Sequence, residues 1–118
     1  MLPAASRVRR SADFTGVLRS GRRAGRGPLV VHMMIPASEP VGAARAGFVV
    51  GRAVGNAVAR NRTRRRLRHL VAQRLSTVPA GATLVVRALA GAADLSSPQL
   101  AGHLDAVLLR LNAKVGAA

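Results

Sequence analysis

The sequence predicts an α/β fold, a two-layer sandwich in which a sheet of about four strands is packed with three helices. Two observations predict it: three segments carry apolar residues at helical spacing, and short runs of β-branched residues lie between them. Each apolar helix face or strand buries itself against another layer. The chain has 118 residues and is 49% apolar, which suffices for one core, so we expect a single domain over residues 1–118.

The segment SADFTGVLRSG, residues 11–21, predicts a short helix. Ser11 is a suitable N-cap residue, and Gly21 is a typical stop signal. Phe14, Val17 and Leu18 recur at the spacing i, i+3 and i+4, which places their side chains on one face of the helix. This apolar face predicts a helix that packs on the sheet.

The next segments predict strands. Residues 22–27 are basic and glycine-rich, which indicates a loop or a short edge strand. The run PLVVHMMI, residues 28–35, reads as a strand whose proline stands at its beginning. After a turn region, the run AGFVVGR, residues 46–52, predicts the following strand.

The second half predicts two longer helices separated by a strand. One helix begins near Val54 or Asn56 and ends at about residue 76, where VPAGA interrupts it. The run TLVVRAL, residues 83–89, predicts a strand, and Ser96 with Gln99 forms a capping-box pattern before the last helix. The apolar stripe of that helix consists of Leu100, Leu104, Val107, Leu108, Leu111 and Val115.

The charge of the chain predicts a polyanionic partner. Nineteen basic and four acidic residues give a formal net charge of +15, and such self-repulsion destabilises a compact state unless a polyanion is bound. Nucleic acid is the first candidate and an anionic membrane surface the second. No apolar run is long enough to span a membrane.

We expect a cytoplasmic location, because the chain contains no cysteine. The start, MLPAASRVRRSADF, has the composition of an organellar transit peptide, but it also fits well as part of the fold.

The stretch GNAVARNRTRRRLRHL, residues 55–70, is the most informative part of the sequence. Six of the nine residues from Arg60 to Arg68 are arginine, and no acidic residue lies between Glu39 and Asp94 to offset their repulsion within the helix. The pattern therefore predicts an anion-binding helix. The side chain of Asn56 and the amides at the helix start would add donors for phosphate.

On a helical wheel, this segment has an apolar side and a basic side. Arg60 and Arg64 fall close to the apolar side, where an unpaired charge is too costly to bury, so we expect the first half of the helix to overhang the sheet. The packed side comprises Thr63, Leu67, Leu70, Val71 and Leu75. The predicted positive ridge comprises Arg62, Arg65, Arg66, Arg68 and His69.

The composition favours phosphate contacts over base stacking and gives no sign of protein-based catalysis. Phe14 and Phe48 are the only aromatic residues, whereas single-strand binders usually stack bases on several aromatic side chains. The strand RAGFVV lacks the further aromatics of an RRM sheet. The four carboxylates are far apart in the sequence and form no metal-ligand or acid–base pattern, and no Walker loop is present.

Three segments carry a resemblance to a known family. RSADFTGVLRSG, VGNAVARNRTRRRLRHL and TLVVRAL resemble, in this order, the bacterial ribonuclease P protein component, and the resemblance covers about residues 7–111. It implies a left-handed β-α-β crossover formed by the arginine helix. It also implies a subunit of the ribonucleoprotein that removes the 5′ leader from precursor tRNA.

The resemblance also implies the partners and the cofactor. The expected partners are ribonuclease P RNA and precursor tRNA, with no DNA and no membrane. The RNA subunit would perform the hydrolysis with Mg²⁺ bound mainly through RNA, and the protein alone would need no cofactor and supply no catalytic residue.

The expected site residues follow by position. The residues expected to bind the catalytic RNA are Asn56, Arg60, Asn61, Arg62, Arg64, Arg65 and Arg68. The residues expected to bind the leader are Phe14, Leu18, His32, Arg52 and Arg87. Leu18 stands where a second phenylalanine is common, and His32 near where a tyrosine is common. Leader contacts should therefore depend more on Arg52 and Arg87. From the residues alone, His32 is either a half-buried strand residue or a ligand-facing one.

Three other functions are less consistent with the sequence. A ribosomal-type RNA-binding protein would share the composition, but not the lead-in to the arginine helix or the first helix. A membrane-active cationic protein would need a bulky apolar face along the whole basic helix. A free-standing nuclease would need catalytic residues that the sequence does not offer.

Overall fold

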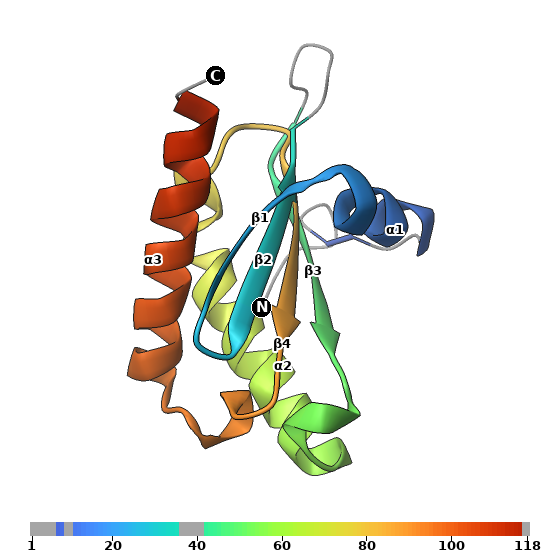
Figure 1. Ribbon diagram of the computed structural model, residues 1–118, viewed down its shortest axis with the longest axis vertical. Coiled ribbons are helices and arrows are strands. Elements are labelled where there is room, and N and C mark those ends of the chain that lie inside the picture. The colour runs from blue at the N-terminus through green and yellow to red at the C-terminus, as the bar shows by residue number, and fades with distance from the viewer. Residues whose placement is uncertain (1–6, 9–10, 36–41, 117–118) are drawn as a thin grey trace.

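A computed structural model describes residues 7–8, 11–35 and 42–116, apart from the side chains of residues 11–13, 20 and 114–116. The predicted α/β architecture is confirmed: three helices surround a four-stranded sheet (Figure 1). The helices are α1 (Ser11–Ser20), α2 (Ala57–Ala72) and α3 (Ser97–Gly116). The strands are β1 (Arg22–Arg26), β2 (Leu29–Met34), β3 (Arg45–Val50) and β4 (Thr83–Ala88).

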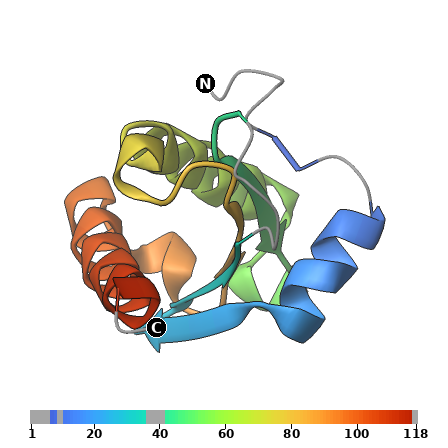
Figure 2. The ribbon, with the colours of Figure 1, turned by 90° about the horizontal axis from the view of Figure 1, so that it is seen from above.

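The strands are ordered β1-β2-β4-β3 across the sheet. β1 pairs with β2, and β2 with β4, in antiparallel fashion, whereas β3 and β4 are parallel. The connection from β3 through α2 to β4 turns in the left-handed sense (Figures 1 and 2). Such connections are right-handed in about 98% of cases, so this is the feature that residue patterns alone would not predict.

Each face of the sheet is covered by different helices (Figure 2). α2 and α3 pack on one face and α1 on the other. Cross-strand partners share a face, so the register places Val31 and Val86 among the core residues under α2 and α3. His32, Val85 and Gly47 lie on the face that α1 covers in part. The first face holds the main core, in which Leu29, Val31, Leu67, Val86 and Leu104 are fully buried.

Residues 22–27 resolve the choice that the sequence left open, because they form the edge strand β1 and its turn. Gly27 has φ of 57°, a conformation that favours glycine, and it closes the hairpin between Arg26 and Leu29. His103 of α3 packs on this turn, where a β-carbon at Gly27 would lie 2.8 Å from the imidazole Cε1 atom. The hairpin is therefore fitted closely to α3.

The two long helices follow their predicted patterns, with one difference in length. α2 ends at Ala72 and a 3-10 turn, η3 (Leu75–Thr77), follows, so the helix is shorter than predicted. The Thr77 hydroxyl donates to the Arg74 carbonyl at 2.7 Å, which tightens the chain before the proline that follows.

At α3, the capping box is confirmed. The Ser96 amide donates to the Gln99 side chain at 2.8 Å, and the Gln99 amide donates to the Ser96 hydroxyl at 3.2 Å. The predicted stripe is buried from Leu100 to Leu111. The side chains of Ser11 and Val115, two other predicted positions, lie outside the described residues.

Candidate nucleic-acid interface

The connection from β3 into α2 sets the start of the arginine helix. A 3-10 turn, η2 (Arg52–Val54), is followed by Gly55 with φ of 149°, where a β-carbon would lie 2.9 Å from that of Ala59. Asn56 caps α2, because its side-chain oxygen accepts a hydrogen bond from the Ala59 amide at 2.8 Å. The G-N-A-V lead-in is therefore a turn-and-cap signal, and Asn56 has a structural partner beside its predicted role in RNA binding.

Helix α2 is divided along its length into an overhanging part and a packed part. Its buried residues are Thr63, Leu67, Leu70 and Val71, and none of its first six residues is buried. The Thr63 hydroxyl donates to the Ala59 carbonyl at 2.9 Å, so its polar group is satisfied inside the helix. The predicted overhang is confirmed.

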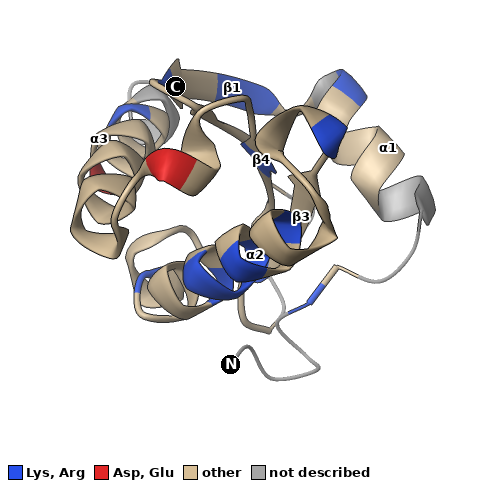
Figure 3. Ribbon diagram, turned by 90° about the horizontal axis from the view of Figure 1, so that it is seen from below, with Lys and Arg blue, Asp and Glu red and all other residues tan. Residues whose placement is uncertain are grey.

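Five arginines of α2 form the surface that we call the arginine ridge. They are Arg60, Arg62, Arg64, Arg65 and Arg68. Arg62 and Arg65 are exposed, and the other three are half-buried. The carboxylates among the described side chains belong to Asp94 and Asp105, and neither forms an ion pair with the ridge. Figure 3 shows the basic residues gathered along α2. Within the ridge, Arg64 Nη1 donates to Asn61 Oδ1 at 3.2 Å, so the ridge can bind phosphate without first breaking an ion pair to a described carboxylate.

Arg66 was predicted to belong to the positive ridge, and the structure corrects this. Its Nη1 donates to the Leu95 carbonyl at 3.0 Å, which ties α2 to the segment before α3. Arg74 has a similar structural role, because its Nε lies 2.5 Å from Asp105 Oδ1 of α3 and its Nη1 donates to the Leu70 carbonyl at 2.9 Å. These two arginines brace the fold.

The edge of β3 carries a small pocket in which both aromatic residues of the chain meet arginines. Phe14 of α1 and Phe48 of β3 line a cavity of about 110 Å³ together with Arg7, Arg64 and Arg68. The structure thus brings Phe14, a predicted leader residue, beside two arginines predicted to bind the catalytic RNA. Phe48 and Arg7 are not among the predicted site residues. The glycine beside Phe48 was the available signal, because glycine within a strand often marks a close approach of another element.

The α1 face of the sheet is open beyond α1. A hollow of about 450 Å³ is lined by Arg23, Gly25, Val30, Arg87 and Leu89. Arg87 was predicted, whereas Arg23 of the edge strand was not. Two guanidinium groups and aliphatic side chains therefore border this hollow, which suits a phosphodiester backbone and apolar base faces.

His32 lies on the same face of the sheet and is buried, with 3% of its surface exposed. Neither ring nitrogen has a hydrogen-bond partner among the described residues. Burial, and then the positive charges of Arg87 and Arg23, lower the pKa of His32. The imidazole is therefore neutral at physiological pH. The sequence left two interpretations of His32, and its burial agrees better with a strand residue than with a ligand-facing one.

The other two predicted leader residues lie at the surface. Leu18 of α1 is 37% exposed, and Arg52 is exposed in η2 directly after β3. Neither lines the hollow or the β3-edge pocket. The five predicted leader residues thus lie on α1, the sheet and η2 rather than in one cavity.

The described residues contain no group of three histidine, aspartate or glutamate side chains placed to hold a metal ion. Over the same part of the chain, no helix is both long and apolar enough to cross a membrane.

Comparison with known proteins adds independent findings. The Ribonuclease P family model matches residues 2–112. The ribonuclease P protein component of Streptomyces bikiniensis is 54% identical over 117 residues, covering 94% of this chain and 95% of that protein. The same component of Salinispora tropica is 52% identical over 132 residues, covering 98% of this chain and 97% of that protein.

Solved structures agree with the sequence relatives. The RNase P protein of Staphylococcus aureus superposes with a TM-score of 0.78 at 28% identity, covering 88% of this chain and 93% of that chain. The RNase P protein of Thermotoga maritima has the same fold, with a TM-score of 0.75 at 23% identity over 88% of this chain and 96% of that one. The left-handed crossover, the capped arginine helix and these relatives agree: the chain belongs to the family of ribonuclease P protein components.

Proposed function

We propose that this chain binds the RNA subunit of ribonuclease P through the arginine ridge, and the 5′ leader of precursor tRNA on the α1 face of its sheet. As a ribonuclease P component it serves an endoribonuclease of tRNA processing. The assignment of the ridge rests on Arg62 and Arg65. Both are exposed on α2, and neither has a carboxylate partner among the described residues. Phosphate groups would provide the missing counter-charge.

The leader is proposed to follow the sheet face. Arg87 and Arg23 would hold backbone phosphates over the hollow, and Arg52 would add a contact at the end of β3. Phe14 would offer its ring at the β3-edge pocket, next to Arg64 and Arg68. Because Leu18 replaces an aromatic ring, base stacking there gives way to aliphatic packing.

The chemistry is proposed to belong to the RNA subunit. Asp94 and Asp105 belong to no group of three potential metal ligands among the described residues, and Asp105 is engaged with Arg74, so the described donor set does not suit Mg²⁺. Magnesium bound through RNA would supply the hydrolysis. The protein side chains would bind and orient the two RNA partners, in the cytoplasm.

A reconstitution tests this function. The purified protein is mixed with a bacterial ribonuclease P RNA at low magnesium, and release of the 5′ leader from precursor tRNA is followed, with protein alone and RNA alone beside it. Cleavage that depends on both components supports the proposal. Tight RNA binding without any stimulation would indicate a ribosomal-type protein instead, and cleavage by the protein alone would reveal a protein active site.

A further inference from the structure

The edge strand β1 carries a second group of arginines that the proposed function does not use. Arg22 and Arg26 are exposed and stand on the same side of the strand, roughly 13 Å apart along it. Ala24 between them is buried against the core, where β1 meets α3. The two arginines therefore flank the contact between β1 and α3, which we call the seam.

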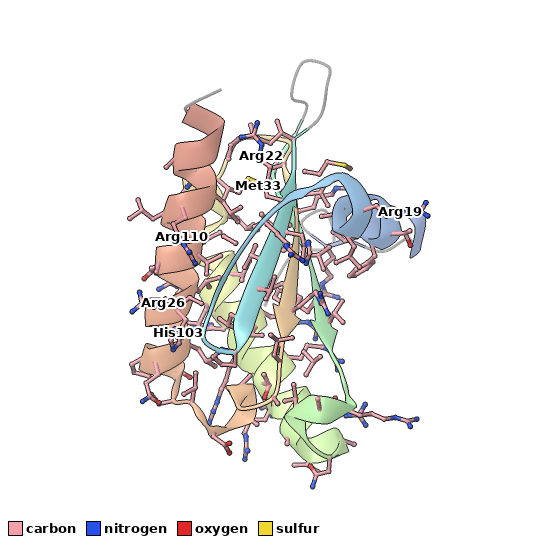
Figure 4. The ribbon with its side chains drawn as sticks, in the orientation of Figure 1. Arg19, Arg22, Arg26, Met33, His103 and Arg110 are labelled. Atoms are coloured by element: carbon pink, nitrogen blue, oxygen red, sulfur yellow. The ribbon has the colours of Figure 1, made fainter. Side chains whose placement is uncertain are left out.

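A third arginine closes this row from the helix side. Arg110 of α3 donates a hydrogen bond to the carbonyl of Gly25 and so lies between the other two. Figure 4 shows Arg22, Arg110 and Arg26 in this order along the seam. The side chains of Arg22 and Arg26 form no ion pair or hydrogen bond with a described residue, and Asp105 of α3 is engaged with Arg74.

The seam and the hollow are separated only by the strand itself. Successive side chains of a strand point to opposite faces, so Arg23 and Gly25 line the hollow while Arg22 and Arg26 border the seam. A phosphodiester backbone that lies in the hollow can therefore pass over the edge of the sheet and stay close to arginine side chains along the whole path.

The strand order gives this path a direction. β3, which leads into the arginine ridge, and β1 are the opposite edges of the sheet. The cleavage site must lie near the catalytic RNA, and hence on the β3 side. Leader nucleotides further upstream then lead away, across the sheet toward β1.

We infer that the seam binds the phosphodiester backbone of distal leader nucleotides, those upstream of the segment held in the hollow. This inference rests on the proposed function. Charged residues on an edge strand also discourage pairing between copies of a chain, but that effect would not depend on the length of a leader.

The test measures affinity as a function of leader length. Holoenzyme is reconstituted with a bacterial ribonuclease P RNA and either the native protein or Arg22→Gln/Arg26→Gln. The dissociation constants of precursor tRNAs with a graded series of leader lengths are then compared. The single variant Arg26→Gln is also measured, and Arg19→Gln is its matched control. Both substitutions remove one positive charge from an exposed residue, but Arg19 lies on α1, away from the seam (Figure 4). Circular dichroism checks that each variant folds.

We expect about threefold weaker binding per arginine removed, for long leaders only. Short leaders that end within the hollow, and the Arg19→Gln control, should show no change. Equal weakening at every leader length, or none at any length, overturns the inference. If the native holoenzyme itself gains no affinity from a leader, the proposed leader site fails, and the inference fails with it.

Discussion

Phe14 lies against the backbone of Gly47, so that its Cε1 atom is 2.6 Å from the place where a β-carbon on Gly47 would sit. Real β-carbons do not approach carbon atoms so closely. The absence of a side chain in the middle of β3 therefore allows α1 to bring its aromatic ring to the edge of the sheet, beside Arg64 and Arg68.

Substituting Gly47→Ala should displace Phe14 and lower the free energy of unfolding by about 1–3 kcal/mol, as overpacking does in a filled site. Gly102→Ala is the control, because a β-carbon there meets nothing within 4 Å and alanine favours a helix. Urea denaturation measures both. An unchanged Gly47→Ala midpoint would mean that Phe14 moves aside freely.

Reversing charge at Arg62 and Arg65 to glutamate should weaken binding of ribonuclease P RNA and leave the protein folded, because both side chains are exposed. The slope of log K against log salt should also become shallower, since each lost phosphate contact removes about 0.7–0.9 from it. Filter binding over a salt series gives both quantities. A collapsed circular dichroism spectrum would contradict the exposed position of the ridge.

Arg66→Ala should behave in the opposite way. Its guanidinium donates to the Leu95 carbonyl, so its loss should reduce the free energy of unfolding by about 1 kcal/mol. RNA affinity at low temperature should change less than for Arg65→Ala. Thermal unfolding and RNA binding of the two variants, measured side by side, test this division. A larger loss of RNA affinity for Arg66→Ala than for Arg65→Ala would mean that Arg66 binds RNA as the ridge does.

His32 should make stability depend on pH. Its pKa is lowered in the folded state, so the unfolded chain takes up its proton first as the pH falls. The full contribution to stability is present above about pH 6.5 and decreases below it, by at most about 1.4 kcal/mol per pH unit. His32→Leu should flatten this part of the stability–pH curve, whereas His69→Gln, at an exposed position, should retain it. A native curve without slope below pH 6.5 would contradict the assignment.

Much of the fold could be predicted because its signals are local. The spacing of apolar residues, the capping box at Ser96 and the overhang of α2 all depend on neighbours along the chain. The left-handed crossover could not be derived in this way, since it depends on how strands far apart in the sequence pair.

The site residues that the sequence did not predict also depend on contacts between distant parts of the chain. A helical wheel assigns Arg66 to the outside, but its partner carbonyl at Leu95 lies 29 residues further along the chain. Arg23 is not among the predicted leader residues, because its place on the hollow depends on the pairing of β1 with β2, which puts it directly opposite His32. The sequence predicts Phe48 only as a strand residue, whereas residues of α1 and α2 complete a pocket around it.

The division of α2 at Thr63 has a consequence for reading substitutions in this helix. Ahead of Thr63 no residue of α2 is fully buried, so at an exposed position such as Arg62 the size of a replacement should matter less than its positive charge. From Thr63 onward, the positions at Leu67, Leu70 and Val71 accept or reject a residue by its volume. Side-chain volume thus becomes a criterion only from Thr63 onward and only at positions that face the core, whereas charge remains the criterion at ridge positions on both sides of Thr63.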